Sequence, residues 1–148
     1  MAMDGDATPS AREGEPTVLE FGGLRFEVSF REVGATLRVD GKVDDRWTEM
    51  LRFDDFVDVP HFHAPASGDS IPFDRAAHGE PLAWYVEQIQ DHLTEWLEKS
   101  GFGEVLTTID VDEVSRNASR LTGAMEACVP PGFVRVPGVG LQRAVVAS

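Results

Sequence analysis

The sequence predicts an α+β fold, in which a curved antiparallel β-meander of four to five strands carries two helices packed on one face. Three observations support this prediction. The first half of the chain alternates apolar and polar residues with the two-residue period of strands, divided by short turns that contain Gly or Asp. The second half has apolar residues at three- and four-residue steps, which is typical of helices with one buried face. Strands followed by helices favour a two-layer arrangement.

The length of the chain, 148 residues, suits a single domain. Residues 1–16 are rich in small, acidic and proline residues and lack apolar periodicity, so we expect a disordered leader there. Residues 17–136 are expected to form one α+β domain, and residues 137–148 a C-terminal tail.

The clearest strand is the segment 24–31, in which Leu24, Phe26, Val28 and Phe30 alternate with polar residues. Further strands are expected at 18–21, 35–39 and 47–53, with a short fifth one around 59–64. Gly22-Gly23, Gly34 and Asp40-Gly41 are the expected turns.

The clearest helix is the segment 81–100, which begins at Pro81 and has its apolar residues on one stripe. A second helix is expected from Asp110 to Cys128, because Asp110 and Glu113 have the spacing of a capping box. The segment 133–136 is expected to add an edge strand.

The charge of the chain restricts its partners. It has 26 acidic and 13 basic residues, a net charge of −13, which argues against binding of nucleic acid and of anionic membranes. No long apolar run, secretory signal or cysteine pair is present, so a cytoplasmic location is expected. The excess of arginine over lysine is typical of proteins from high-GC bacteria.

The net charge is unevenly distributed. Residues 114–148 hold one acidic residue, Glu126, and four arginines, Arg116, Arg120, Arg135 and Arg143. We therefore expect these arginines to lie against the acidic body, within the molecule or across a dimer.

The sharpest chemical feature is His61-Phe62-His63, with His78 further along the chain. Residues two apart on a strand lie on the same face, so His61 and His63 are candidate ligands of one divalent metal ion, with His78 or a nearby carboxylate completing the set. In the alternative interpretation, Phe62 packs in the core and both imidazoles face solvent or loop carbonyls.

Other candidate residues carry weaker signals. Asp54 and Asp55 lie between aromatic residues, where burial would raise a carboxyl pKa, and with His61 and His63 they are candidate catalytic groups. The alternative is a solvated turn. Trp84 lies off the main apolar stripe of its helix, which suits a ligand-pocket wall or a dimer contact.

Two functional hypotheses follow. The first is a small cytoplasmic binding or interaction module, homodimeric, which contacts a protein partner or a small-molecule ligand, with His61, His63, His78 and Trp84 as ligand-binding candidates. It is favoured because motifs for nucleophilic, nucleotide-binding and dinucleotide-binding sites are absent. The second is a small metal-assisted enzyme that uses His61, His63 and His78 together with Asp54 or Asp55. Metal content and oligomeric state would distinguish the two hypotheses.

Overall fold

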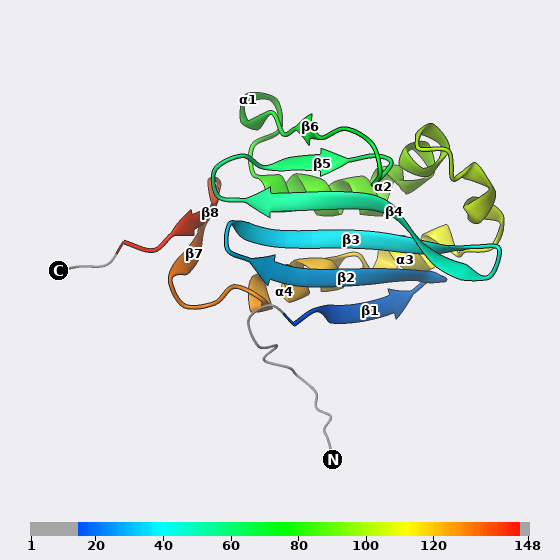
Figure 1. Cartoon of the computed structure of the whole chain (residues 1–148), viewed down its shortest axis with the longest axis horizontal. Coiled ribbons are helices and arrows are strands. Elements are labelled where there is room, and N and C mark those ends of the chain that lie inside the picture. The colour runs from blue at the N-terminus through cyan, green and yellow to red at the C-terminus, as the bar shows by residue number, and fades with distance from the viewer. Residues whose placement is uncertain (1–14, 146–148) are drawn as a thin grey trace, which may run out of the picture.

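The computed structural model describes residues 15–145 and confirms the predicted α+β class, with an antiparallel β-meander as its main sheet (Figure 1). Six strands follow one another in the order of the sequence, and each is antiparallel to the next. They are β1 (Thr17–Phe21), β2 (Leu24–Arg31), β3 (Gly34–Val43), β4 (Arg46–Phe56), β5 (His61–His63) and β6 (Ile71–Pro72).

The two central strands are longer than the sequence pattern predicted. The turn expected at Asp40-Gly41 lies instead at Asp44-Asp45, where both residues have positive φ, 51° and 69°. Aspartate tolerates this conformation better than most residues. The register of β3 and β4 shifts between Val39 and Asp40, because β4 has one extra residue there. Such a bulge interrupts the alternation of apolar and polar residues, which explains why the sequence pattern predicted a turn at Asp40-Gly41 and ended the strand before it.

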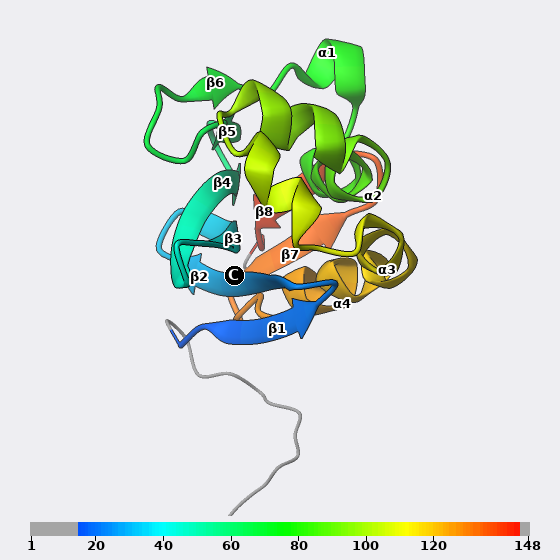
Figure 2. The same ribbon diagram turned by 90° about the vertical axis from the view of Figure 1, so that its right-hand side faces the viewer.

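The helices cover one face of the sheet, as predicted, and leave the other face without a helical layer (Figure 2). They are α1 (Arg75–His78), α2 (Pro81–Lys99), the 3₁₀ helix η1 (Gly103–Thr107), α3 (Val111–Asn117) and α4 (Ser119–Ala127). The second predicted helix is divided into α3 and α4 at Ala118. Asp110 caps α3 as expected, since its carboxylate accepts a hydrogen bond from the backbone N–H of Glu113.

The described part of the segment expected as a C-terminal tail contains a strand. Strand β7 (Phe133–Val136) pairs with β8 (Gly140–Arg143) in a separate hairpin and does not join the main sheet. Leu141 is only 1% exposed, and the ring of Phe133 lies 4.9 Å from that of Phe30. The hairpin therefore packs against the body of the domain. The leader expected at residues 1–16 lies almost entirely outside the described residues, and β1 begins at Thr17.

The core lies between the sheet and the helices. The apolar residues of β2, β3 and β4 alternate toward α2, η1 and α4, and the largest fully buried side chains come from both layers. They include Tyr85, Phe26, Phe53, Leu37, Ile89, Leu93, Leu121 and Met125. No helix in the part of the chain that the structure describes is long and apolar enough to cross a membrane.

Two of the C-terminal arginines lie against the body as expected. Arg135 forms an ion pair with Asp55 of β4, and the guanidinium of Arg120 lies 5.3 Å from the ring centroid of Phe21 in β1. The basic C-terminal segment thus contacts the sheet within one molecule.

Candidate functional site

The two histidines of β5 point away from the helices. Phe53 of β4 and Phe62 of β5 are directly paired, and their rings stack beneath α2, 5.9 Å apart. Because neighbouring residues of a strand point to opposite faces, Asp54, His61 and His63 lie on the face without helices, called the outer face below. Asp54 is paired directly with His61.

These three side chains meet around Asp54. Its Oδ2 atom lies 3.0 Å from Nε2 of His61 and 3.7 Å from Nε2 of His63. One ligand atom from each residue falls in a group whose members are all within 4.8 Å of one another. Asp54 is 4% exposed, and the two imidazoles are 20% exposed, so the carboxylate is shielded by the histidines.

Both imidazoles are oriented by backbone carbonyls. Nδ1 of His61 lies 2.8 Å from the carbonyl oxygen of Val59, and Nδ1 of His63 lies 2.9 Å from that of Gly68. Because a carbonyl oxygen only accepts hydrogen bonds, each Nδ1 carries the proton. In a neutral imidazole Nε2 then presents a lone pair, here toward the carboxylate of Asp54. Three electron-rich atoms thus converge, and a proton or a metal cation between them would stabilise this arrangement.

Two hydroxyl groups contact Asp54 and His61 from their other sides. Thr36 of β3 donates a hydrogen bond of 2.9 Å from Oγ1 to Oδ1 of Asp54, which leaves Oδ2 for the histidines. On the helix side, the hydroxyl of Tyr85 lies 3.0 Å from the carbonyl oxygen of Asp54 and 3.1 Å from that of His61. Burial raises the pKa of Tyr85 well above its ordinary value, so this hydroxyl remains a donor.

Asp55 is separated from this cluster. It points to the helix side, is fully buried, and its Oδ2 atom accepts a 2.6 Å hydrogen bond from Nη1 of Arg135. Burial raises the pKa of Asp55, and Arg135 opposes that shift. The predicted solvated turn is absent, because β4 continues to Phe56 and takes Asp55 into the interior.

His78 and Trp84 are also remote from the cluster. The ring of His78 stacks on that of Trp84 at 4.6 Å, and both lie near Phe73. Trp84 in turn contacts the buried Phe62, so this group lies on the helix side of β5. Within residues 15–145, only Asp54, His61 and His63 form a group that could hold a metal ion, and His78 is not part of it.

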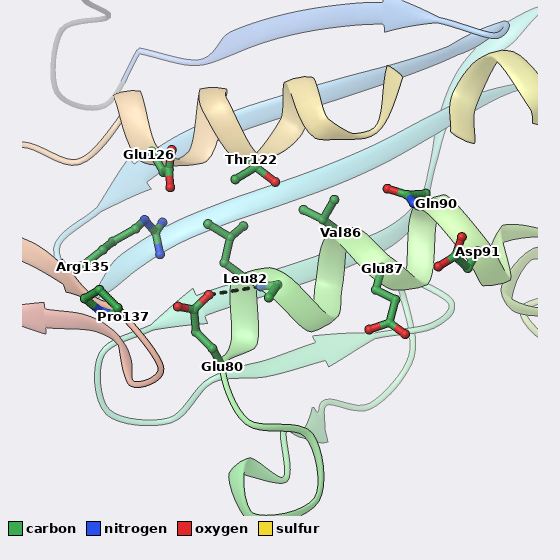
Figure 3. Close-up of a pocket in the computed structure, with 11 residues that line it drawn as sticks. Glu80, Leu82, Val86, Glu87, Gln90, Asp91, Thr122, Glu126, Arg135 and Pro137 are labelled. Carbon is green, nitrogen blue, oxygen red and sulfur yellow. Dashed lines mark hydrogen bonds between the residues drawn. The ribbon is translucent and has the colours of Figure 1, made fainter. Parts of the chain in front are cut away.

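A cleft of about 510 Å³ lies between α2, α4 and β7 (Figure 3). Leu82 and Val86 supply apolar surface. Carboxylates surround it, from Glu80, Glu87, Asp91 and Glu126. Arg135 closes one end, where its side chain is already paired with Asp55 and with the carbonyl oxygen of Met125. The cleft contains no histidine and is separate from the outer face.

Sequence reasoning missed Thr36, Tyr85 and the choice of Asp54 over Asp55. The alternation around the buried Phe53 places Asp54 on the opposite face, which was a usable signal. The contacts of Thr36 and Tyr85 depend on strand register and helix position, which no local pattern of the chain specifies.

The comparisons with known proteins identify a family and leave its chemistry open. A family model with the description "Domain of unknown function (DUF7700)" matches residues 18–124. That range includes the Asp54, His61 and His63 cluster and ends before the β7–β8 hairpin. Neither a curated protein nor a solved structure matches the chain.

Proposed function

The chain belongs to the family described as "Domain of unknown function (DUF7700)", and we propose that it is a binding module whose ligand is a divalent transition-metal ion held by Asp54, His61 and His63. The observation that carries the proposal is the orientation of the two imidazoles. Each donates its Nδ1 proton to a backbone carbonyl and directs Nε2 toward Oδ2 of Asp54. Metal-binding histidines commonly have this second hydrogen bond, which fixes the ring and its tautomer.

The ligand types favour particular ions. Imidazole nitrogen suits zinc, iron, cobalt, nickel and copper, whereas magnesium and calcium prefer oxygen ligands. Two histidines and one carboxylate leave further coordination positions open. Because both imidazoles are partly exposed, those positions face the outer surface, where water or a small ligand has access.

A metal-assisted enzyme is the second candidate function, and the open coordination positions favour it. A metal ion with three protein ligands can bind water and lower its pKa, which produces a hydroxide nucleophile near neutral pH. In this proposal Asp54, His61 and His63 are ligands, and Asp55 and His78 have no role in the reaction.

The test is a titration of untagged, metal-free protein with Zn²⁺ and Co²⁺, followed by calorimetry and by the visible absorption of Co²⁺. We expect one ion per chain. The variants His61→Gln, His63→Gln and Asp54→Asn should each weaken binding at least tenfold, since each removes one ligand. His92→Gln is the matched control, because His92 is exposed on α2 and bonded to Glu95. His78→Gln should also leave affinity unchanged.

The result that overturns the proposal is absence of stoichiometric binding, or binding that the His61 and His63 variants do not weaken. In that case a proton shared by His61 and Asp54 explains the contact. Thermal unfolding of each variant without metal identifies loss of folding, and the two histidine variants keep the test valid if Asp54→Asn does not fold.

We also propose a cytoplasmic location and self-association. Cys128 is a half-buried free thiol, which suits a reducing compartment. Val134, Val136 and Val139 are exposed on the β7–β8 hairpin and supply apolar surface for a second copy of the chain. Light scattering at tens of micromolar protein tests self-association, and a monomer at that concentration contradicts it.

A further inference from the structure

Arg52 occupies the fourth corner of the patch that the three candidate metal ligands define. On β4, Arg52 and Asp54 are two residues apart and share the outer face. Across the strand pair, Arg52 is paired with His63 and Asp54 with His61. Directly paired residues on one face have Cβ atoms about 5 Å apart. The four side chains therefore form one compact rectangle.

The guanidinium of Arg52 still has donors available. It pairs with Glu49 through Nε and Nη2, at 2.8 Å and 3.1 Å, which leaves Nη1 with no acceptor among residues 15–145. The register shift between β3 and β4 brings Glu49 and Arg52, three residues apart, into contact on the same face. The side chain of Arg52 is 35% exposed and accessible to a ligand.

The charges around this corner favour an anion once a metal ion is bound. A divalent ion exceeds the single negative charge of Asp54, and Arg52, whose charge Glu49 partly offsets, adds a cationic hydrogen-bond donor beside it. The chain as a whole carries a net charge of −13 and repels anions, so attraction depends on the metal ion and on the remaining donors of Arg52. Guanidinium groups bind phosphate and carboxylate oxygens with directed hydrogen bonds.

We propose that the bound metal ion and Arg52 together form a site for an oxyanion, the phosphate or carboxylate group of a small anionic ligand. One oxygen of the anion fills an open coordination position of the metal, and another accepts hydrogen bonds from Nη1 of Arg52. This inference rests on the proposed metal site, and its test separates the two.

The experiment uses full-length protein loaded with one equivalent of Co²⁺ and two probes, inorganic phosphate and acetate. The visible absorption of Co²⁺ reports a change in its ligands, and equilibrium dialysis confirms that the ion stays bound. We expect saturable binding of an anion by the loaded protein and none by the metal-free protein. Preference for phosphate or for acetate identifies which oxyanion the site takes.

Two variants break the same ion pair with opposite expected effects. Arg52→Gln removes the anion donor and should weaken anion binding at least tenfold, with Co²⁺ affinity changed by less than about threefold. Glu49→Gln removes the competing carboxylate and frees Arg52, so anion binding should become tighter by about twofold or more. Arg31→Gln is the matched control, because Arg31 is exposed at the end of β2 and lies opposite Gly34 of β3 in the sheet register.

The outcomes are distinguishable. Failure of Co²⁺ to bind overturns the proposed function itself. If Co²⁺ binds but neither anion does, or if Arg52→Gln and Glu49→Gln weaken anion binding alike, the proposed metal function remains and the role of Arg52 is overturned. A purely structural ion pair would produce that second result, since both variants break it.

Discussion

The hydroxyl of Tyr85 lies 3.0 Å from the carbonyl oxygen of Asp54, so the helix layer contacts the backbone of a residue whose side chain points to the opposite face. The same hydroxyl lies 3.1 Å from the carbonyl oxygen of His61. Tyr85 is fully buried and its ring packs 5.1 Å from that of Phe53. Helix α2 therefore positions two candidate ligand residues of the outer face through their backbone carbonyl groups.

The first prediction follows from this contact. Tyr85→Phe should lower the free energy of unfolding by about 1–3 kcal/mol, because the carbonyl oxygens of Asp54 and His61 lose the one hydroxyl proton that they share. Affinity for Co²⁺ should fall as well, by less than it falls in His61→Gln. Thermal unfolding and the Co²⁺ titration measure the two effects. Asn117→Ala, which removes a hydrogen bond to the carbonyl oxygen of Glu113 in α3, should change stability alone.

The second prediction concerns Thr36, which orients the carboxylate of Asp54. Thr36→Val keeps the shape of the side chain and removes the hydrogen bond to Oδ1. Metal affinity should fall about tenfold, as is typical when a partner of a metal ligand is lost. Thr107→Val is the control, because the Thr107 hydroxyl donates only to the nearby carbonyl oxygen of Glu104. Equal affinity in both variants would contradict an orienting role for Thr36.

The third prediction concerns the buried pair of Asp55 and Arg135. Arg135→Met leaves the carboxylate of Asp55 buried without its partner and should cost about 3–5 kcal/mol at neutral pH. Burial already raises the pKa of Asp55 above its unfolded value. A folded state that holds the proton more tightly loses stability as pH rises between the unfolded and the folded pKa. Loss of Arg135 raises the folded-state pKa of Asp55 further. The pH range over which stability falls therefore extends to higher pH.

Urea unfolding at pH 5 and pH 8 measures this dependence. The stability difference between wild type and Arg135→Met should be larger at pH 8 than at pH 5. The double variant Asp55→Asn with Arg135→Met has no buried charge, and its difference from wild type should change less with pH. A difference for Arg135→Met that is the same at both pH values would show that Asp55 does not titrate as described.

The fourth prediction concerns the single cysteine. Burial raises the pKa of Cys128 to about 11, so very little thiolate exists at pH 8. The thiolate is the reactive form, and an unperturbed cysteine has a pKa of about 8.5. Alkylation of folded protein should therefore be at least about 100 times slower than alkylation of the protein in urea. Comparable rates in the two states would mean that Cys128 is not protected by the fold.

The extent to which the sequence predicts this molecule differs between its parts. The alternation from Leu24 to Phe30 and the stripe of the 81–100 segment each depend on a local period, and both elements form as predicted. The same local period places His61 and His63 on one face. The division of the second helix at Ala118 has no such signal, since neither Pro nor Gly lies there.

The parts that could not be predicted depend on contacts between distant segments. His78 was grouped with the other histidines because it is near them in sequence, but its ring packs on Trp84 across the sheet from them. Arg52 was not singled out, because its place beside His63 requires the register of β4 and β5. Asp55 contacts Arg135, which is 80 residues further along the chain.

All three candidate ligands belong to a single β-hairpin, from Asp54 on β4 to His63 on β5. The chain between them is short, so even an unfolded polypeptide keeps these side chains at high local concentration. A metal ion would then bind the unfolded chain to some degree, and its stabilisation of the fold would be smaller than its affinity for the native protein implies.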